Sequence, residues 1–294
     1  MSRVHDALRR AEQLGISPVA NRPELHGRSS DASSGAANDV VLSSERLTAL
    51  LDDQLEGVLD RVEEIPYSPA EEAHLISLES PAEMPGEEFR SLRTRLNHLQ
   101  TMQKLHTIVV TSASPAEGKT FTAFNLALTQ AQLSENPVLM ADLDLRRPSV
   151  HRQLQLDRGL GFSDYIQGNA PLEKCLRKLR GTSLYLMTAG SPVKNPLEIL
   201  GAQETKITIE QRLPRLFNWA ILDSPPLLFS ADANLLATLT DGTLIVVRVG
   251  ATTYDNIVRA MQTLCENNVL GIVVNGARAQ ELYSKFTYYY SKTD

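Results

Sequence analysis

Residues 107–120 read TIVVTSASPAEGKT, and this stretch decides the fold class. The apolar run TIVVT is typical of a buried β-strand, and a helical pattern begins at Lys119. A strand and a helix joined by a loop that ends in Gly-Lys-Thr form a phosphate-binding loop, whose backbone N–H groups and helix dipole bind an anion. The stretch therefore predicts a nucleotide-binding α/β domain.

The loop carries the side chains expected of a nucleoside triphosphate site. Lys119 is expected to neutralise the β- and γ-phosphates, and the Thr120 hydroxyl to bind Mg²⁺. Ala113 stands where the general pattern has its first glycine, and alanine does not readily adopt the left-handed conformations that glycine allows. A fortuitous Gly-Lys-Thr at a helix start is the alternative, which the preceding strand and the acidic motifs downstream disfavour.

Apolar runs and helical segments alternate around this loop. Helices are predicted over residues 86–103 and 119–133. Further strands are predicted at residues 138–141, 184–187, 219–222, 244–247 and 272–274. Continuous apolar strands separated by helices predict a mainly parallel sheet with helices on both faces, and a ligand at the carboxyl ends of the strands.

Two acidic motifs follow predicted strands. Asp142 and Asp144, in MADLDLRRP at residues 140–148, are spaced by two and lie on the same face of an extended segment. One carboxylate can hold the water shell of a metal while the other accepts a hydroxyl proton. The alternative is an acidic turn held by Arg146 and Arg147. Asp223 closes the run in ILDSPP at residues 221–226, as a Walker B carboxylate that anchors Mg²⁺ through water does.

Composition and charge exclude several classes of protein. The 294 residues include 29 Lys and Arg against 35 Asp and Glu, and an acidic chain without a basic, aromatic-rich patch gives little support for nucleic-acid binding. The two cysteines, Cys175 and Cys265, suit neither a disulfide scaffold nor a zinc site and indicate a reducing cytosol. No apolar run approaches the roughly 18–20 residues of a spanning helix, so a cytoplasmic protein is expected.

Residues 1–85 differ in composition from the rest of the chain, with 16 acidic and seven basic residues. A Ser-, Ala- and Gly-rich linker is predicted at residues 16–45, between a short amphipathic helix and a second helix that ends before Pro66. The first helix suits docking on a membrane adaptor or lipid, and equally packing on the chain's own surface. The predicted division is N-terminal helices and acidic flexible linker (1–85), P-loop domain (86–281) and tyrosine-rich C-terminal tail (282–294).

Together these motifs give the chain a family resemblance. It resembles the bacterial tyrosine kinases, or BY-kinases, of capsule and exopolysaccharide synthesis, which are P-loop proteins related to the MinD and ParA ATPases. The family patterns TSxxPGEGKT, an aspartate motif and Asp-x-Pro-Pro match residues 111–120, 141–148 and 223–226. Ala116 replaces the loop glycine of the family. The opening MSRVHDALRRAE is similar to that of members associated with exosortase-type systems.

The resemblance implies a non-specific protein-tyrosine kinase that transfers the γ-phosphoryl group of ATP to its own C-terminal tyrosines and regulates exopolysaccharide and capsule synthesis and export. The catalytic residues would be Lys119, Asp142 and Asp144. The Mg²⁺ site would use Thr120, Asp142, Asp144 and Asp223. The ATP-binding residues would be Ala116, Glu117, Gly118, Lys119, Thr120, Phe121 and Asn275. The phosphoacceptors would be Tyr283, Tyr288, Tyr289 and Tyr290.

The resemblance also implies partners. Glu87, Arg90 and Arg93 match a Glu-x-x-Arg-x-x-Arg helix that forms subunit contacts in a homo-oligomeric ring, although at this spacing they could equally form a solvated network within one helix. A membrane polysaccharide copolymerase (a chain-length-determinant adaptor) would hold the protein at the inner face of the plasma membrane, and a cognate tyrosine phosphatase would oppose it.

Several alternatives stay open at this point. The chain could be a MinD- or ParA-like ATPase switch, although Ser114 stands where those proteins have a signature lysine, or an ATP-binding regulatory module without kinase activity. Either Asp142 or Asp144 could be the base. Asn275 could contact the nucleotide base or simply be a hydrogen-bonded turn residue. The tyrosine tail could pack as a strand rather than accept phosphate.

Overall fold

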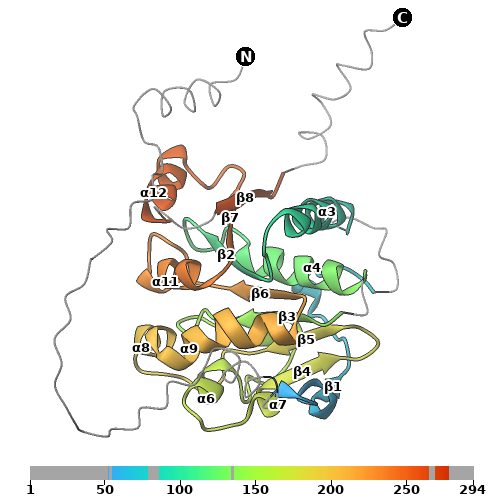
Figure 1. Ribbon diagram of the computed structural model, residues 1–294. Helices are drawn as coiled ribbons and strands as arrows, with labels where there is room; N and C mark the ends of the chain where they lie inside the picture. The colour runs from blue at the N-terminus through green and yellow to red at the C-terminus, as the bar shows by residue number, and fades with distance from the viewer. Residues whose placement is uncertain (1–51, 53–54, 79–85, 134–135, 265–268, 278–294) are drawn as a thin grey trace, which may run out of the picture. The chain divides into compact units, whose positions relative to one another are not determined.

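The computed structural model describes residues 52, 55–78, 86–133, 136–264 and 269–277, all within one compact unit, residues 44–294 (Figure 1). Its eight strands are β1 (Glu63–Ile65), β2 (Thr107–Ser112), β3 (Val138–Asp142), β4 (Leu176–Leu179), β5 (Leu184–Met187), β6 (Trp219–Asp223), β7 (Gly242–Arg248) and β8 (Val269–Asn275). They form one sheet in the order β1-β4-β5-β3-β6-β2-β7-β8. All neighbours run parallel except β4 and β5. The predicted mainly parallel sheet is confirmed.

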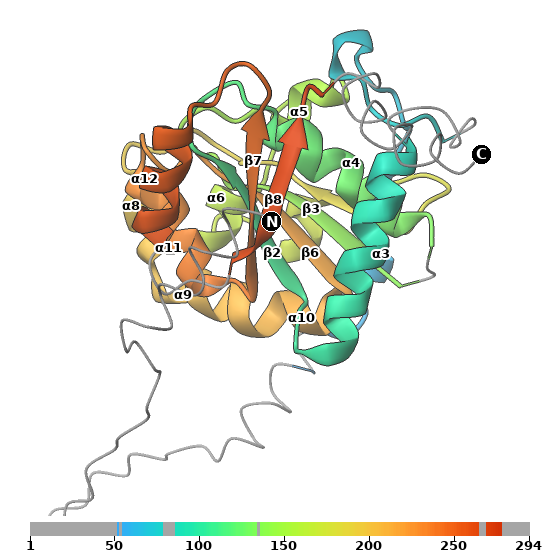
Figure 2. The same ribbon diagram turned by 90° about the horizontal axis from the view of Figure 1, so that it is seen from above.

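Helices cover both faces of this sheet, as predicted. The helices are α3 (Gly86–Met102), α4 (Lys119–Ala131), α5 (Val150–Gln153), α6 (Phe162–Ile166), α7 (Leu172–Cys175), α8 (Pro196–Gly201), α9 (Gln203–Ile207), α10 (Leu213–Leu216), α11 (Ala231–Leu239) and α12 (Tyr254–Leu264), with 3₁₀ turns η1 (Leu59–Arg61) and η2 (Glu71–Ala73) and a π-helical turn η3 (Thr208–Arg212). Figure 2 shows α3 and α4 on one side of the strands and α11 and α12 on the other. No helix in the described part of the chain has the length and hydrophobicity needed to cross a lipid bilayer.

The continuous apolar strands supply two cores, one on each face of the sheet. Successive side chains of a strand point to opposite faces, so a fully apolar strand is buried only if both faces are covered. In β2, Ile108 and Val110 join the core under α3 and α4, whereas Val109 joins the core under α11 and α12. Because both faces are covered, the middle of each central strand is apolar, and the buried polar side chains Thr107, Thr111, Ser112, Asp142 and Asp223 lie at or near strand ends.

The segment that precedes α3 differs from the prediction. A helix was expected to continue almost to Pro66, but η1 and then β1 occupy this stretch, and β1 pairs with β4 at the edge of the sheet. Farther along, the backbone N–H of Ile76 donates to Asn125 Oδ1 of α4 at 2.8 Å, a buried bond. Residues 55–78 are thus tied both to the edge of the sheet and to α4. The linker at 16–45 lies outside the described residues, and the domain division remains a prediction.

Candidate active site

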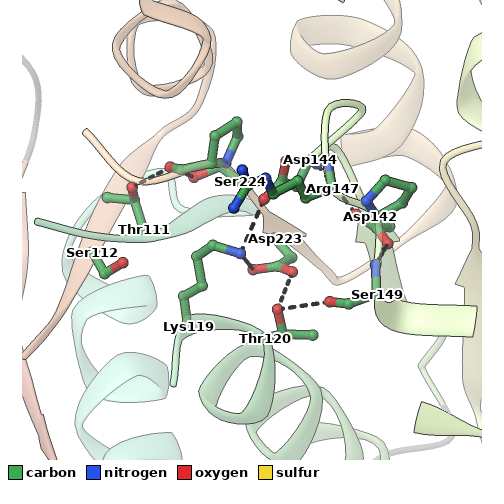
Figure 3. Close-up of polar contacts among 12 residues, drawn as sticks. Thr111, Ser112, Lys119, Thr120, Asp142, Asp144, Arg147, Ser149, Asp223 and Ser224 are labelled. Carbon is green, nitrogen blue, oxygen red and sulfur yellow. Dashed lines mark hydrogen bonds and ion pairs between the residues drawn. The ribbon is translucent and has the colours of Figure 1, made fainter. Parts of the chain in front are cut away.

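The topology brings the three predicted motifs together. β3, β6 and β2 are neighbours in the sheet, and the register pairs Asp142 of β3 with Asp223 of β6. Because the carboxyl ends of parallel strands meet at one edge, the loops after these strands lie side by side. Figure 3 shows Lys119, Asp144 and Asp223 pointing toward one another at this edge.

The loop between β2 and α4 has the backbone of a phosphate-binding loop. Gly118 has φ of 96°, and the side-chain amide of Asn275 donates to the Glu117 carbonyl at 3.0 Å. A Cβ atom at position 118 would overlap that amide, so only glycine fits there. Asn275 thus holds the loop, and its Oδ1 also accepts the Gly276 N–H at 2.8 Å, as expected of a hydrogen-bonded turn residue; its contact with a nucleotide base stays a prediction.

Two alanines replace loop glycines, with different consequences. Ala113 is fully buried and is not among the described residues with positive φ, so it needs no glycine. Ala116 has φ of 62°, a left-handed conformation that costs a non-glycine residue on the order of 1–2 kcal/mol. The glycine of the family pattern would adopt it freely, so the loop of this chain carries strain.

Glu117 supports the loop from inside the protein. Its Oε2 accepts the Ser114 N–H at 2.9 Å, and its Oε1 accepts the Thr252 hydroxyl at 2.6 Å. The Glu117 side chain is buried, so a role in binding nucleotide is confined to its backbone. Sequence reasoning missed Thr252, because nothing near it in the chain marks a partner 135 residues away.

Lys119, Thr120 and Asp223 form one connected polar group. Lys119 Nζ lies 3.1 Å from Asp144 Oδ2 and 3.9 Å from Asp223 Oδ1. The Thr120 hydroxyl donates to Asp223 Oδ2 at 2.6 Å. Burial alone would lower the pKa of Lys119, but the Asp223 and Asp144 carboxylates outweigh it and raise that pKa. The amine is therefore held as a cation.

Asp223 is the most deeply buried group of this set. Burial raises its pKa to about 7, although Lys119 and Thr120 act in the opposite direction. Its Oδ1 is buried and has no hydrogen-bond partner among the described residues. A buried carboxylate oxygen without such a partner is costly and suits contact with a cation or its water shell.

Asp142 and Asp144 have different surroundings in the structure. Asp142 Oδ2 accepts the N–H groups of Ser149 and Val150 at 2.8 and 2.9 Å, and so anchors the start of α5. Burial raises the pKa of Asp142 to about 6 despite these two bonds. Asp144 faces a cavity of about 390 Å³ that Lys119 also lines, whereas Asp142 does not line it.

The arginines that follow these carboxylates do not close an acidic turn with their side chains. Arg146 Nε and Nη2 donate to the two oxygens of Asp232, at 2.6 and 3.0 Å, and Asp232 is fully buried. Arg147 contributes its backbone N–H to Asp144 Oδ1 at 3.0 Å. The arginine side chains thus leave the carboxyl group of Asp144 facing Lys119 and the cavity.

A second cavity lies on the other side of the loop. It has a volume of about 740 Å³ and is lined by Phe121, Asn275, Arg248 and residues 72–75. The predicted nucleotide-binding residues therefore divide into two groups, with Lys119 in the first cavity and Phe121 and Asn275 in the second. The segment 72–75, which sequence reasoning assigned to a linker region, forms part of this second wall.

Comparison with known proteins agrees with this geometry. The chain is 29% identical over 221 residues to the tyrosine-protein kinase YwqD of Bacillus subtilis, which covers 74% of this chain and 92% of YwqD. It is 30% identical over 220 residues to the tyrosine-protein kinase Etk of Escherichia coli strain K12, over 71% of this chain. The solved kinase domain of Escherichia coli ETK matches with a TM-score of 0.62 at 29% identity, covering 74% of this chain and 83% of that one. The chain is a homologue of the bacterial tyrosine kinases.

The comparisons confirm the predicted resemblance and fold class. The MinC:MinD complex of Aquifex aeolicus matches at 23% identity with a TM-score of 0.50, which supports the P-loop fold alone. No protein-family model matches the chain. The chain spans 92% of YwqD but only 29% of Etk, so it matches one part of the longer relative.

In this tyrosine kinase homologue the donor set fits Mg²⁺. The Thr120 hydroxyl and the Asp144 and Asp223 carboxylates are hard oxygen ligands at the mouth of the loop. Among the described residues, no three acidic, His or Cys side chains are grouped so as to enclose a metal ion. Mg²⁺ commonly uses one or two protein carboxylates together with phosphate oxygens and water, which agrees with this open arrangement.

Other predicted residues of the kinase homologue lie away from this cavity. On α3, Arg90 forms an ion pair with Glu87 at 2.8 Å, and Arg93 donates to the Thr129 carbonyl of α4 at 2.9 Å. The predicted interface helix therefore makes contacts within the chain, and its subunit contacts remain a prediction. Tyr283, Tyr288, Tyr289 and Tyr290 lie outside the described residues.

Proposed function

We propose that the chain is a protein-tyrosine kinase that transfers the γ-phosphoryl group of ATP to tyrosine, chiefly to Tyr283, Tyr288, Tyr289 and Tyr290 of its own tail. The observation that carries the proposal is the meeting of Lys119 with Asp144 and Asp223 beside the phosphate-binding loop. The homology to named tyrosine kinases supports tyrosine as the acceptor.

The two cavities fit the two ends of ATP. The triphosphate would lie along the loop N–H groups, with its γ-phosphate in the cavity of Lys119 and its base in the cavity of Phe121 and Asn275. Thr120 and Asp223 would hold Mg²⁺, which neutralises charge on the β- and γ-phosphates when it is bound. Lys119 would stabilise the charge on the transferred group.

Asp144 is placed to accept the proton of the tyrosine hydroxyl. Its carboxylate lies in the cavity beside Lys119, whereas both oxygens of Asp142 accept backbone N–H groups. A phenol has a pKa near 10, so a carboxylate at the hydroxyl helps to remove the proton as the phosphoryl group moves. Asp142 would act by positioning the loop that carries Asp144.

The wall of the cavity is suited to an aromatic acceptor. Phe229 lines it together with Pro226, and Phe229 is 68% exposed, which is unusual for a phenylalanine. A tyrosine ring packed on Phe229 would lie in the cavity that Lys119 and Asp144 also line. The aromatic contact would favour tyrosine over serine or threonine.

Replacing Phe229 by alanine should therefore weaken acceptor binding. We expect Phe229→Ala to raise the KM for a tyrosine peptide about fivefold to tenfold, with a kcat and an ATP affinity within twofold of the unmodified protein. Steady-state kinetics with a synthetic tail peptide measures both constants. Leu197→Ala, which removes an exposed apolar side chain that lines neither cavity, is the matched control. An unchanged KM would show that Phe229 does not contact the acceptor.

The wider role follows from the same proposal. The kinase would regulate exopolysaccharide and capsule synthesis and export, in the cytoplasm at the inner face of the plasma membrane. A polysaccharide copolymerase adaptor would hold it there, and a tyrosine phosphatase would reverse the modification. Unmodified tails would dock in neighbouring subunits of a ring, and phosphates, at about −1.5 to −2 charges each, would be repelled from the acidic site.

The proposal is tested by incubating the full-length chain with Mg²⁺ and ATP and mapping phosphopeptides. We expect phosphate on the C-terminal peptide that contains residues 283–290, and none in the Asp144→Asn variant. Phosphate release from ATP without phosphotyrosine would support the alternative of an ATPase switch. Nucleotide binding without either product would support a regulatory module.

A further inference from the structure

Arg158, in the loop between α5 and α6, has a buried hydrogen-bonding edge that no described residue uses. Its Nε and Nη2 atoms are buried, and neither has a hydrogen-bond partner in the described ranges. These two N–H groups form the side of a guanidinium that binds two oxygens of one carboxylate or phosphate. Arg146 uses the same two atoms to hold Asp232. Leaving charged donors buried and unpaired is costly, so this edge is suited to an oxyanion.

Other positive groups surround Arg158. The guanidinium of Arg177 on β4 lies so close to Gly159 that a Cβ atom at position 159 would overlap the guanidinium. Arg177 Nη1 also donates to the Asp157 carbonyl at 3.2 Å. His151 Nδ1 is also buried without a hydrogen-bond partner among the described residues. Burial lowers the pKa of His151, and the charges of Arg152, Arg158 and Arg177 lower it further. Three guanidinium groups therefore act on one imidazole.

Acidic side chains nearby do not neutralise this cluster. Glu63 is the register partner of Arg177 on the neighbouring strand, and Asp157 precedes Arg158 in the chain. Even so, none of the ion pairs between described residues involves Arg158, Arg177 or His151. The cluster thus presents positive charge and directed donors that form no ion pair with an anion of the described residues.

The cluster adjoins α5 and is separate from the nucleotide cavities. His151 is the second residue of α5. The N–H of Val150, the first residue of this helix, donates to Asp142 of β3 at 2.9 Å. Neither Arg158 nor Arg177 lines the cavity of Lys119 or the cavity of Asn275. A ligand at the cluster would therefore lie beside the start of α5 and not in the nucleotide site.

We propose that Arg158, Arg177 and His151 form a binding site for a phosphate group, separate from the nucleotide site. The bidentate edge of Arg158 would take two phosphate oxygens, and Arg177 would offset the remaining charge. The phosphate could belong to a phosphotyrosine of this chain or be free phosphate, since both present the same oxygens. The site does not depend on the proposed kinase activity, because it is tested with a synthetic phosphopeptide.

The test uses full-length protein saturated with Mg²⁺ and ADP, so that the phosphate-binding loop is occupied. Isothermal titration calorimetry measures binding of three probes: inorganic phosphate, a peptide of residues 281–294 phosphorylated at Tyr289, and the same peptide without phosphate. We expect the phosphopeptide to bind and the plain peptide to bind at least tenfold more weakly. Equal affinity for inorganic phosphate and phosphopeptide would identify free phosphate as the ligand.

Variants locate the binding to the cluster. Arg158→Gln should weaken phosphopeptide binding at least tenfold, and Arg158→Lys, which keeps the charge but loses the bidentate edge, severalfold. Arg180→Gln removes an exposed arginine just after β4 and should change the affinity less than twofold. Retained ADP binding shows that a variant is folded. If Arg158→Gln does not fold, the phosphopeptide affinities of Arg158→Lys and Arg177→Gln provide the test. Equal affinities in the folded variants, or no phosphate-dependent binding, would overturn the proposal.

Discussion

The Lys119→Met variant should lose tyrosine phosphorylation by at least about a thousandfold and still fold. Lys119 Nζ lies 3.1 Å from Asp144 in the proposed γ-phosphate cavity, and methionine fills similar space without charge. Loss of one preorganised donor commonly lowers kcat by about 10² to 10³, and the lost cation also leaves the phosphate charge uncompensated. The initial rate of phosphotyrosine formation measures the effect.

Lys194→Met is the matched control, because it removes the same charge from an exposed position. Its rate should stay within twofold of the unmodified protein. Native mass spectrometry of Lys119→Met gives a second result: the unphosphorylated variant should form a larger assembly than the phosphorylated wild type. Equal masses would contradict the tail-held ring, whereas phosphorylation by Lys119→Met at a near-normal rate would contradict the proposed active site.

The Asp223→Asn variant should bind Mg²⁺-nucleotide about ten- to a hundredfold more weakly, while the nucleotide-free protein becomes more stable above neutral pH. Burial raises the folded-state pKa of Asp223 to about 7, from an ordinary value of 3.8. The folded protein therefore binds this proton more tightly than the unfolded chain, and its stability falls as pH rises from about 4 to 7. Asparagine removes that loss and still accepts the Thr120 hydroxyl.

Urea denaturation at two pH values tests the sign of this effect. The variant should be more stable than the unmodified protein by about 2 kcal/mol at pH 8, and by a smaller margin at pH 4.5. Asp255→Asn, at an exposed acidic residue of α12, should show no pH-dependent difference. A variant that is less stable than wild type at pH 8 would mean that the pairing with Lys119 outweighs the burial of Asp223.

The parts of the fold and site that could be predicted from the sequence are encoded locally. The phosphate-binding loop lies in one contiguous stretch, and each central strand is an apolar run because both of its faces are buried. Asp142, Asp144 and Asp223 could be assigned to one edge of the sheet, since each follows such a strand. The comparisons confirm the resemblance to bacterial tyrosine kinases and the fold that these motifs predicted.

The parts that could not be predicted depend on contacts between distant residues. β1 and β4 are short and mixed in polarity, and they become strands only by pairing at the edge of the sheet. The support of Glu117 by Thr252 and the pairing of Arg146 with Asp232 join residues that no local pattern connects. The different surroundings of Asp142 and Asp144 likewise arise from α5, whose position depends on the folded chain.

The attachment of residues 55–78 limits how the protein can be shortened for experiments. A recombinant fragment that begins at residue 86 would expose the outer backbone of β4, and unpaired strand edges promote aggregation. The same fragment would also lose the hydrogen bond from the Ile76 N–H to Asn125, a residue of the helix that starts at Lys119. Fragments intended for assays or crystallisation should therefore begin before residue 55.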